Sequence, residues 1–271
     1  MPEGDTVRRT AVRLGEALGG ATLRRADLRH PRLSTKDLTG RVVTAVRSVG
    51  KHLFVRFDDE LSLHNHLGMD GSWRLYDPNR PAPVSHRTRV ILETADTLAL
   101  GQQLVELALV RTADEGRLVA HLGPDLLDPD WSAEHSATAT ARLSREPGRE
   151  LGLALLDQAV MAGIGNVYKA EICFLLGVSP WTPVSEVDAA EAVALSRKLL
   201  LHNANRGVRT TTGDPRRGRE LWVYGRERTG CLRCGGRVVA TSQGGGTRER
   251  VAYYCPRCQP GPAGPADPPK R

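Results

Sequence analysis

The chain has 271 residues, with 38 basic against 31 acidic side chains and a formal net charge of +7. Its 40% hydrophobic and 25% charged content is that of a globular protein rather than a disordered one. No apolar run approaches the roughly 18 residues of a membrane span, and the first residues lack the pattern of a secretory signal. We therefore expect a soluble, cytoplasmic protein without a membrane partner.

Basic charge is concentrated near the C-terminus. Residues 205–271 hold 14 Lys and Arg against 5 Asp and Glu, whereas residues 1–204 hold 24 against 26. Nearly all of the basic residues are arginines, whose planar guanidinium suits bidentate contact with phosphate. A polyanionic partner is one explanation. A solvated basic face in an arginine-rich composition is the other, and charge alone does not separate them.

The first half of the chain predicts a helix followed by strands. The helix covers residues 5–18, with Asp5 as its N-cap, Gly19-Gly20 as its stop and a buried stripe formed by Val7, Ala11, Leu14 and Leu18. Short β-rich runs separated by Gly, Asp and Pro turns then extend to His121, which is typical of an antiparallel sandwich or barrel. These runs are Val42-Val43, Leu53–Val55, Leu61–Leu63 and Val90–Leu92.

After residues 122–125 the pattern becomes helical. Leu151, Leu155, Leu156 and Val160 form one apolar stripe, and Val167, Ala170 and Phe174 form the next. Between the stripes lies the glycine turn 162–166, and a further helix is predicted over residues 188–201. A basic loop, 206–219, and a proline-rich tail from Pro260, which we expect to be disordered, complete this half.

Four cysteines give the strongest chemical signal. Two C-x-x-C pairs separated by twenty residues supply four thiolates to a tetrahedral zinc, namely Cys231, Cys234, Cys255 and Cys258. Four protein ligands leave no open position, so we expect one structural Zn²⁺. The segment between the two pairs predicts a β-hairpin, with strands over residues 237–240 and 251–254 and a glycine turn over 244–246. Two disulfides or redox pairs are less favoured alternatives in a cytoplasmic chain. The fifth cysteine, Cys173, falls on an apolar stripe and is predicted to lie in the core.

Two further features are compatible with a nucleic-acid partner. The hairpin carries Arg237, Arg248, Arg250 and Arg257, which can reach phosphates or a groove. The glycine turn before Asn166 lets a backbone approach closely, and a helix that begins there directs its free N–H groups outward at a phosphate. A plain helix connection, with Asn166 as an N-cap, is the alternative.

The N-terminus offers a nucleophile. Met1-Pro2 is a context from which the initiator methionine is normally removed, and the exposed proline amine then titrates near the usual α-amino range of about 7.7–8.0. A neutral secondary amine can attack C1′ of a deoxyribose and form an iminium. Glu3 could transfer the proton that this step requires. Taken alone these two residues favour no catalytic role, because many proteins begin in the same way.

Taken in order, the motifs resemble those of the formamidopyrimidine-DNA glycosylase and endonuclease VIII family over about residues 2–259. The matching segments are Met1–Gly4, Gly50–Phe54, His66–Gly71, Gly163–Tyr168, Val223–Arg226 and the four-cysteine hairpin. The arginine-rich chain looks most like an actinobacterial endonuclease VIII.

The resemblance implies a two-lobed α+β enzyme that binds damaged DNA as a monomer. It implies an N-terminal β-sandwich catalytic domain with flanking helices over residues 1–122 and a helix–two-turn–helix domain over residues 123–222. A zinc finger over 223–259 and a disordered tail over 260–271 complete the division. The implied location is the cytoplasm, in association with the nucleoid.

The resemblance also implies roles for individual residues. Pro2 matches the nucleophile, Glu3 the general acid–base residue and Lys51 a lysine of β-elimination and phosphate contact. Asn166 matches a phosphate-binding residue, and Arg250 the hairpin arginine of phosphate binding and δ-elimination. Two positions would contact the DNA around an extruded base: Met69 as a wedge, and His121 where related enzymes can carry an arginine facing the opposite strand.

Departures from the family pattern bear on the activity. Thr6 stands where family members commonly have a second glutamate, which leaves a catalytically silent DNA-binding protein as an alternative. The stretch from Thr210 to Leu221 is short, whereas relatives that act on oxidised purines have a longer loop there. The resemblance thus implies a glycosylase and lyase for oxidised pyrimidines that nicks DNA by β,δ-elimination, with the purine-directed sister activity as the enzyme alternative.

Overall fold

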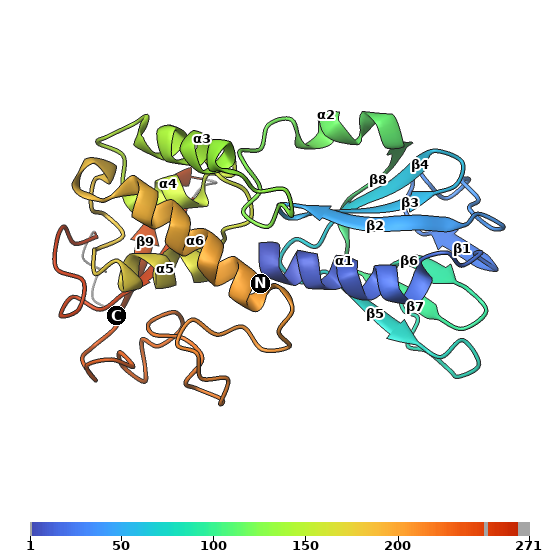
Figure 1. Ribbon diagram of the computed structural model, residues 1–271. Coiled ribbons are helices and arrows are strands. Elements are labelled where there is room, and N and C mark those ends of the chain that lie inside the picture. Colours follow the sequence, from blue (N-terminus) through green and yellow to red (C-terminus); the bar gives the residue numbers. More distant parts are fainter. Residues whose placement is uncertain (1, 247–248, 265–271) are drawn as a thin grey trace. The chain divides into compact units, whose positions relative to one another are not determined.

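The computed structural model describes residues 2–246 and 249–264 of the chain (Figure 1). The chain divides into two compact units, residues 1–121 and 122–271, and each is described by itself. Among the described residues, no helix has the length and apolar character needed to span a membrane.

The first unit combines one long helix with two antiparallel sheets. One sheet has the strand order β2-β3-β4-β8 and the other β1-β6-β7-β5. The helices are α1 (Gly4–Leu18) and α2 (Glu115–Val119), with a 3-10 turn, η1 (Thr112–Asp114), before α2. The strands are β1 (Arg25–Leu28), β2 (Val43–Val49), β3 (His52–Phe57), β4 (Leu61–His66), β5 (Ser72–Tyr76), β6 (Thr88–Glu93), β7 (Leu98–Gln102) and β8 (Val105–Arg111).

The core of this unit lies between the two sheets and under α1. The apolar stripe of α1 predicted from the sequence is buried, with Val7, Ala11, Leu14 and Leu18 at most 2% exposed. These side chains join residues from both sheets in one cluster, so the expected sandwich with a flanking helix is confirmed. The helix begins one residue earlier than predicted and its N-cap is Glu3, whereas Asp5 lies buried in the first turn.

A buried carboxylate connects α2 with the sheet below it. Glu115 is 5% exposed and accepts two hydrogen bonds from Arg56, at 2.9 and 2.7 Å, and one from the Ser62 hydroxyl at 2.6 Å. Burial would raise the pKa of Glu115, but the bonds from Arg56 and Ser62 outweigh it and lower the pKa. Glu115 is therefore an ionised, well-paired group at neutral pH.

The second unit is helical and ends in a hairpin. Its helices are α3 (Ala133–Ser144), α4 (Leu151–Leu156), α5 (Asn166–Leu175) and α6 (Ala189–Ala204), with the 3-10 turn η2 (Val184–Glu186), and its strands are β9 (Val239–Gln243) and β10 (Arg250–Tyr254). Asp188 caps α6, because its carboxylate accepts the backbone N–H groups of Ala190 and Glu191. The predicted helix over 188–201 is thus present and runs one turn further.

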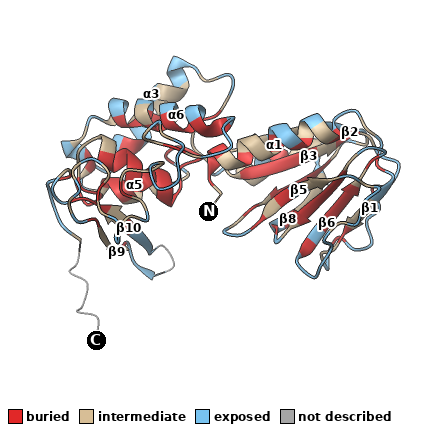
Figure 2. Ribbon diagram, turned by 90° about the horizontal axis from the view of Figure 1, so that it is seen from below, coloured by how far each residue is buried: buried red, intermediate tan, exposed pale blue. Residues whose placement is uncertain are grey.

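Helix α5 forms the centre of this unit. Nine of its ten residues are buried, which Figure 2 shows as an almost continuous red helix. On one side Tyr168 and Ile172 belong to the helical core, and on the other Ala170 and Phe174 pack with Cys231 and Cys255. The helical part and the cysteine module therefore share a core.

Two local predictions need correction. The apolar stripe from Leu151 to Val160 is not one helix, because α4 ends at Leu156 and Asp157 adopts extended backbone angles. The hairpin strands are shifted toward the glycine turn, since β9 begins at Val239 rather than Arg237. Cys173 is fully buried as predicted, and burial raises the pKa of its thiol to about 12.

The described start of the tail contacts the helical unit. The Ser179 hydroxyl donates to the carbonyl of Pro262 at 2.5 Å, and Gly264 lies close against the Trp181 ring. The rest of the tail that the sequence predicts to be disordered, residues 265–271, lies outside the described residues. The same holds for Arg248 of the hairpin.

We predict that Glu115→Gln lowers the free energy of unfolding by about 2–3 kcal/mol at pH 7, the value of charge-assisted hydrogen bonds. Because the Arg56 side chain is 30% exposed, the loss of stability is smaller than the loss expected when a fully buried ion pair is broken. Because the folded-state pKa is lowered, the wild-type advantage is complete at neutral pH and disappears as the pH falls through that pKa. Urea unfolding between pH 7 and pH 3 measures it.

The matched control is Asp114→Asn, since the neighbouring Asp114–Arg117 pair is solvent-exposed and contributes little. Equal stability loss in the two variants, or a loss in Glu115→Gln that does not change with pH, would contradict the assigned role of Glu115.

Candidate functional site

The first two candidate catalytic residues lie at the start of α1. Glu3 is fully buried, and its backbone carbonyl accepts the N–H groups of Thr6 and Val7 at 2.9 and 3.0 Å. Pro2 precedes it directly and is half-buried. The first turn of a rigid, core-packed helix thus fixes the position of both residues.

The direction of α1 places them at a defined end of the sheet. After the helix, the Gly20 N–H bonds to the Val43 carbonyl at the start of β2, and Gly15 lies against Val46. Helix α1 therefore runs antiparallel to β2. From Gly15 back to Gly4 the helix extends about 16 Å, which is longer than the roughly 10 Å of strand from Val46 to the end of β2. The start of α1 therefore lies at the β2–β3 end of the sheet (Figure 1).

Lys51 lies in the turn at that same end. Val49 pairs with His52 across the turn, and Gly50 adopts a left-handed φ of 56°, which a residue without Cβ accommodates. Pro2, Glu3 and Lys51 come from the helix start and a strand turn, and the packing of α1 on β2 brings these two segments to one end of the sheet. Lys51 is half-buried.

The two expected DNA-contacting residues of the first unit lie at this end as well. His66 pairs with His52 across β3 and β4, and Met69 follows in the next turn with 66% of its surface exposed. The ring of His121 meets the ring of His52 edge-on, with centroids 5.8 Å apart. Because most of the Met69 side chain is exposed, Met69 is not a core residue, and the side chain is available to contact a partner.

The same strands contain histidines that the sequence did not single out. The rings of His52 and His64 lie edge to edge, with centroids 5.1 Å apart and His52 Nδ1 2.9 Å from His64 Nε2. Burial lowers the pKa of His52 to about 3, and the neighbouring rings of His64, His66 and His121 and the charge of Lys51 add to this shift. Burial also lowers the pKa of His64 and His66, so these side chains are neutral at neutral pH.

In the second unit Asn166 is the first residue of α5. Gly163, with φ 114°, turns the chain before it, and Gly165 is the N-cap. The Asn166 Nδ2 group donates to the Val251 carbonyl at 2.8 Å, and Lys169 Nζ reaches the same oxygen at 3.4 Å. Asn166 therefore connects the start of α5 to strand β10.

Arg250 is the neighbour of Val251 on that strand. It is exposed, pairs with Gln243 in the β9–β10 ladder, and its Nη1 donates to the Glu249 carbonyl at 2.7 Å. Because Asn166 binds the adjoining carbonyl, the two candidate phosphate-binding residues of this unit come together at one place.

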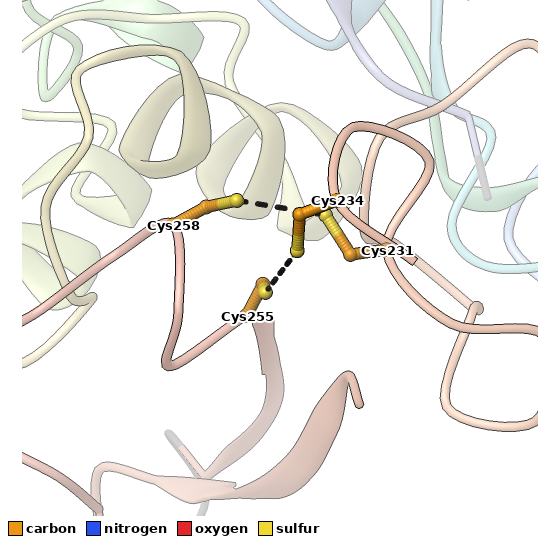
Figure 3. A group of neighbouring side chains, drawn as sticks. All are labelled: Cys231, Cys234, Cys255 and Cys258. Atoms are coloured by element: carbon orange, nitrogen blue, oxygen red, sulfur yellow. Dashed lines mark hydrogen bonds between the residues drawn. The ribbon is translucent and has the colours of Figure 1, made fainter. Parts of the chain in front are cut away.

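The four cysteines are also brought together (Figure 3). Cys231 Sγ lies 3.9 Å from Cys258 Sγ, and Cys234 Sγ lies 3.6 Å from Cys255 Sγ, with no disulfide among them. Thiolates bound at about 2.3 Å to one tetrahedral ion are about 3.8 Å apart. The Gly236 N–H donates to Cys234 Sγ and lowers its pKa to about 7. The cluster can hold a metal ion.

A buried glutamate, which the sequence analysis did not identify, organises the segment before the cysteines. Glu171 on α5 is fully buried and accepts the backbone N–H groups of Trp222, Val223 and Tyr224, at 2.8 to 2.9 Å, and the Thr211 hydroxyl. Only the fold shows its role, because the accepting carboxylate and its donors are about fifty residues apart in the chain.

The comparisons with known proteins agree with one another over nearly all of the chain. The sequence profile of the formamidopyrimidine-DNA glycosylase N-terminal domain matches residues 1–105, and that of the H2TH domain of the same glycosylase matches residues 122–212. A probable endonuclease 8 2 of Streptomyces coelicolor is 53% identical over 97% of this chain and 95% of its own. The DNA-(apurinic or apyrimidinic site) lyase Nei2 of Mycolicibacterium smegmatis is 49% identical over 96% of this chain and 99% of its own.

Solved structures share the fold. The formamidopyrimidine-DNA glycosylase of Lactococcus lactis, crystallised with DNA containing an abasic site, superposes with a TM-score of 0.79 over 96% of this chain and all of that chain. The sequence identity of the two proteins is 22%.

We predict that Glu171→Ala increases hydrogen exchange at the amides of residues 222–224 by at least about tenfold, because each buried N–H that loses its acceptor costs about 1–3 kcal/mol. Native-state exchange followed by mass spectrometry measures this change. The control is Glu186→Gln at an exposed position of the same unit. Unchanged protection of residues 222–224 in Glu171→Ala would show that the carboxylate does not hold this segment.

Proposed function

The chain belongs to the formamidopyrimidine-DNA glycosylase and endonuclease VIII family, and from this premise we propose that it is a DNA glycosylase with abasic-site lyase activity. Its substrate is damaged DNA, from which it removes an oxidised base and then nicks the strand. The observation that carries the proposal is the Pro2-Glu3 pair at the core-packed start of α1, at the sheet end that carries Lys51.

Pro2 acts as the nucleophile once Met1 has been removed. Its nitrogen bonds to C1′ of the damaged nucleotide while the bond from C1′ to the base breaks, and the base leaves with a proton. Opening of the sugar gives an iminium. Loss of a C2′ proton then expels the 3′ phosphate, loss of a C4′ proton expels the 5′ phosphate, and water releases the amine.

Glu3 and Lys51 serve the proton transfers of this sequence. Glu3 is buried beside Pro2, where it can give and take the protons of base departure and ring opening. Lys51 contacts phosphate and assists β-elimination from its turn. Thr6, at the position of a second family glutamate, has a hydroxyl that donates to Asp5 at 3.4 Å, so Glu3 carries the acid–base work without that carboxylate.

Asn166 and Arg250 hold the DNA backbone. The hydrogen bond from Asn166 to the Val251 carbonyl supports this assignment, because it holds the part of β10 that carries Arg250 near the start of α5. Helix N-termini attract phosphate through free N–H groups and the helix dipole, and an arginine adds bidentate contact. Arg250 also assists δ-elimination of the 5′ phosphate.

Met69 and His121 contact the duplex where the damaged base leaves the stack. The exposed Met69 is an apolar wedge for the resulting gap, and such insertion offsets part of the few kcal/mol that base flipping costs. His121 takes the position that faces the opposite strand.

The four cysteines hold one structural zinc. Their Sγ spacing and the N–H that Gly236 donates to Cys234 suit a closed tetrahedral thiolate site. The ion, when bound, secures the β9–β10 hairpin and therefore Arg250. Residues 223–259 form this finger, after a catalytic domain over 1–122 and a helix–two-turn–helix domain over 123–222.

The substrate class is oxidised pyrimidines. The segment after Thr210 is short and closes on itself, because the N–H groups of Thr211 and Thr212 both bond to the Glu220 carbonyl. Asp214 adds ion pairs to Arg216 and Arg219 inside it. Such a loop offers little length to cover a purine.

The enzyme works as a monomer in the cytoplasm, on nucleoid DNA.

We predict that Glu3→Gln slows removal of an oxidised base by about 10²–10⁴-fold, the usual contribution of a general acid–base residue. Cleavage of a ready-made abasic site is expected to slow less, because no base has to be protonated. Single-turnover assays on the two duplexes measure both rates. The control is Glu16→Gln, on the exposed face of the same helix.

Unchanged base removal by Glu3→Gln would contradict the assigned role of Glu3. A wild-type protein that binds abasic DNA with salt-dependent affinity, yet leaves both duplexes uncut, would favour the non-catalytic alternative that Thr6 raises.

We predict that kcat/KM on a thymine-glycol duplex exceeds that on an 8-oxoguanine duplex by at least about tenfold, or about 1.4 kcal/mol of transition-state stabilisation. Parallel steady-state assays with both lesions in one sequence context measure this ratio. A ratio below one would assign the enzyme to the purine-directed activity.

A further inference from the structure

A group of metal-ligating side chains in the first unit lies outside the machinery proposed above. His52 of β3, His64 of β4 and Glu106 of β8 come from three neighbouring strands, and their ligating atoms all lie within 4.8 Å of one another. His52 and His64 are 9% and 3% exposed, whereas Glu106 is exposed to solvent. The two histidines are therefore held in place by the surrounding protein, whereas solvent and ions can reach the group past Glu106.

Two ring nitrogens of the group already lie next to each other. His52 Nδ1 and His64 Nε2 are 2.9 Å apart. Nitrogens bound at about 2.0–2.1 Å to one tetrahedral ion are about 3.3 Å apart, and their lone pairs meet at the ion at an angle of roughly 109°. Binding therefore requires the two rings to separate by about 0.4 Å and to turn away from their in-line contact. His52 then presents the Nδ1 lone pair in place of an N–H, by moving its proton to Nε2, and both rings stay neutral.

The other side of the His64 ring is oriented as in known metal sites. The backbone of Glu106 hydrogen-bonds to this ring, as a carbonyl that accepts a ring N–H. Because Nε2 faces His52, the nitrogen that remains for this bond is Nδ1. Histidine ligands commonly donate their second N–H to a carbonyl, which fixes the tautomer and aims the lone pair at the metal.

Glu106 occupies a backbone position that glycine normally takes. The β4–β8 register shifts between His64 and His66, so that Glu106 and Leu107 stand opposite the single Asn65, as in a β-bulge. Glu106 has φ 53°, a left-handed conformation that is unfavourable for a residue with a long side chain. The carboxylate at this bulge has an oxygen within 4.8 Å of both histidine nitrogens, so it offers a ligand that glycine lacks.

We propose that His52, His64 and Glu106 form a second metal site, which binds a divalent transition-metal ion such as zinc. Two imidazoles and one carboxylate are the ligand set of zinc and iron(II) sites that keep open positions for water. Calcium and magnesium prefer oxygen ligands and are disfavoured here. Lys51 directly precedes His52, and its positive charge opposes a cation at this site, so the site binds more weakly than the four cysteines.

The test uses the full chain with zinc already bound to its four cysteines, and cobalt(II) as the probe. Equilibrium dialysis gives the cobalt bound per chain, and X-ray absorption gives the ligand atoms. The test variants are Glu106→Asn, which suits the left-handed backbone but lacks the carboxylate, and Glu106→Gln, which keeps the side-chain length. The matched control is His86→Ala, an exposed histidine of the same unit.

We expect one cobalt per wild-type chain, bound by nitrogen and oxygen with imidazole scattering, and unchanged binding in His86→Ala. Both Glu106 variants are expected to bind at least about tenfold more weakly, since loss of an outer-shell partner alone costs about 10–100-fold. Absence of cobalt binding, sulfur in its coordination shell, or full affinity in both Glu106 variants would each overturn the proposal. Thermal unfolding of all variants without cobalt verifies that they are folded.

Discussion

The burial of one face of α1 is the constraint on which the proposed chemistry depends. A nucleophile at the chain terminus would normally be mobile, because terminal residues lose conformational freedom only when something holds them. Here Val7, Ala11, Leu14 and Leu18 are buried in the core, where α1 packs on strands β2 and β3, and burial of each larger side chain contributes about 1.5–3 kcal/mol. Because Glu3 and Pro2 directly precede this fixed helix, they are held at the end of the sheet that also carries the Lys51 turn.

Helix α5 has the corresponding role in the second unit. One of its faces belongs to the helical core and the other supports the cysteine module, while its first residue, Asn166, binds the hairpin strand next to Arg250. Glu171 in its middle collects the backbone donors of residues 222–224. A single buried helix thus places the glycine turn, the hairpin arginine and the four thiols.

Much of this could be predicted from the sequence, because the deciding signals are local. The stripe of α1, the helix over residues 188–201 and the two C-x-x-C pairs depend on residues a few positions apart, and the family motifs occur in an unbroken order. Glu171 and the group around His64 could not be predicted, because strand register and loop closure bring their partners together. The break after Leu156 is not predicted either, because apolar spacing alone does not show where a backbone turns.

Reductive trapping tests the central claim, that the Pro2 amine forms a Schiff base with DNA. The zinc-loaded chain without Met1 is treated with borohydride on an abasic-site duplex, beside a chain whose N-terminal tag leaves the Pro2 nitrogen an amide. The account predicts a covalent adduct that mass spectrometry maps to residue 2, no adduct with the tagged chain, and recovery after tag removal. An adduct at Lys51, or none from the correctly processed chain, would contradict it.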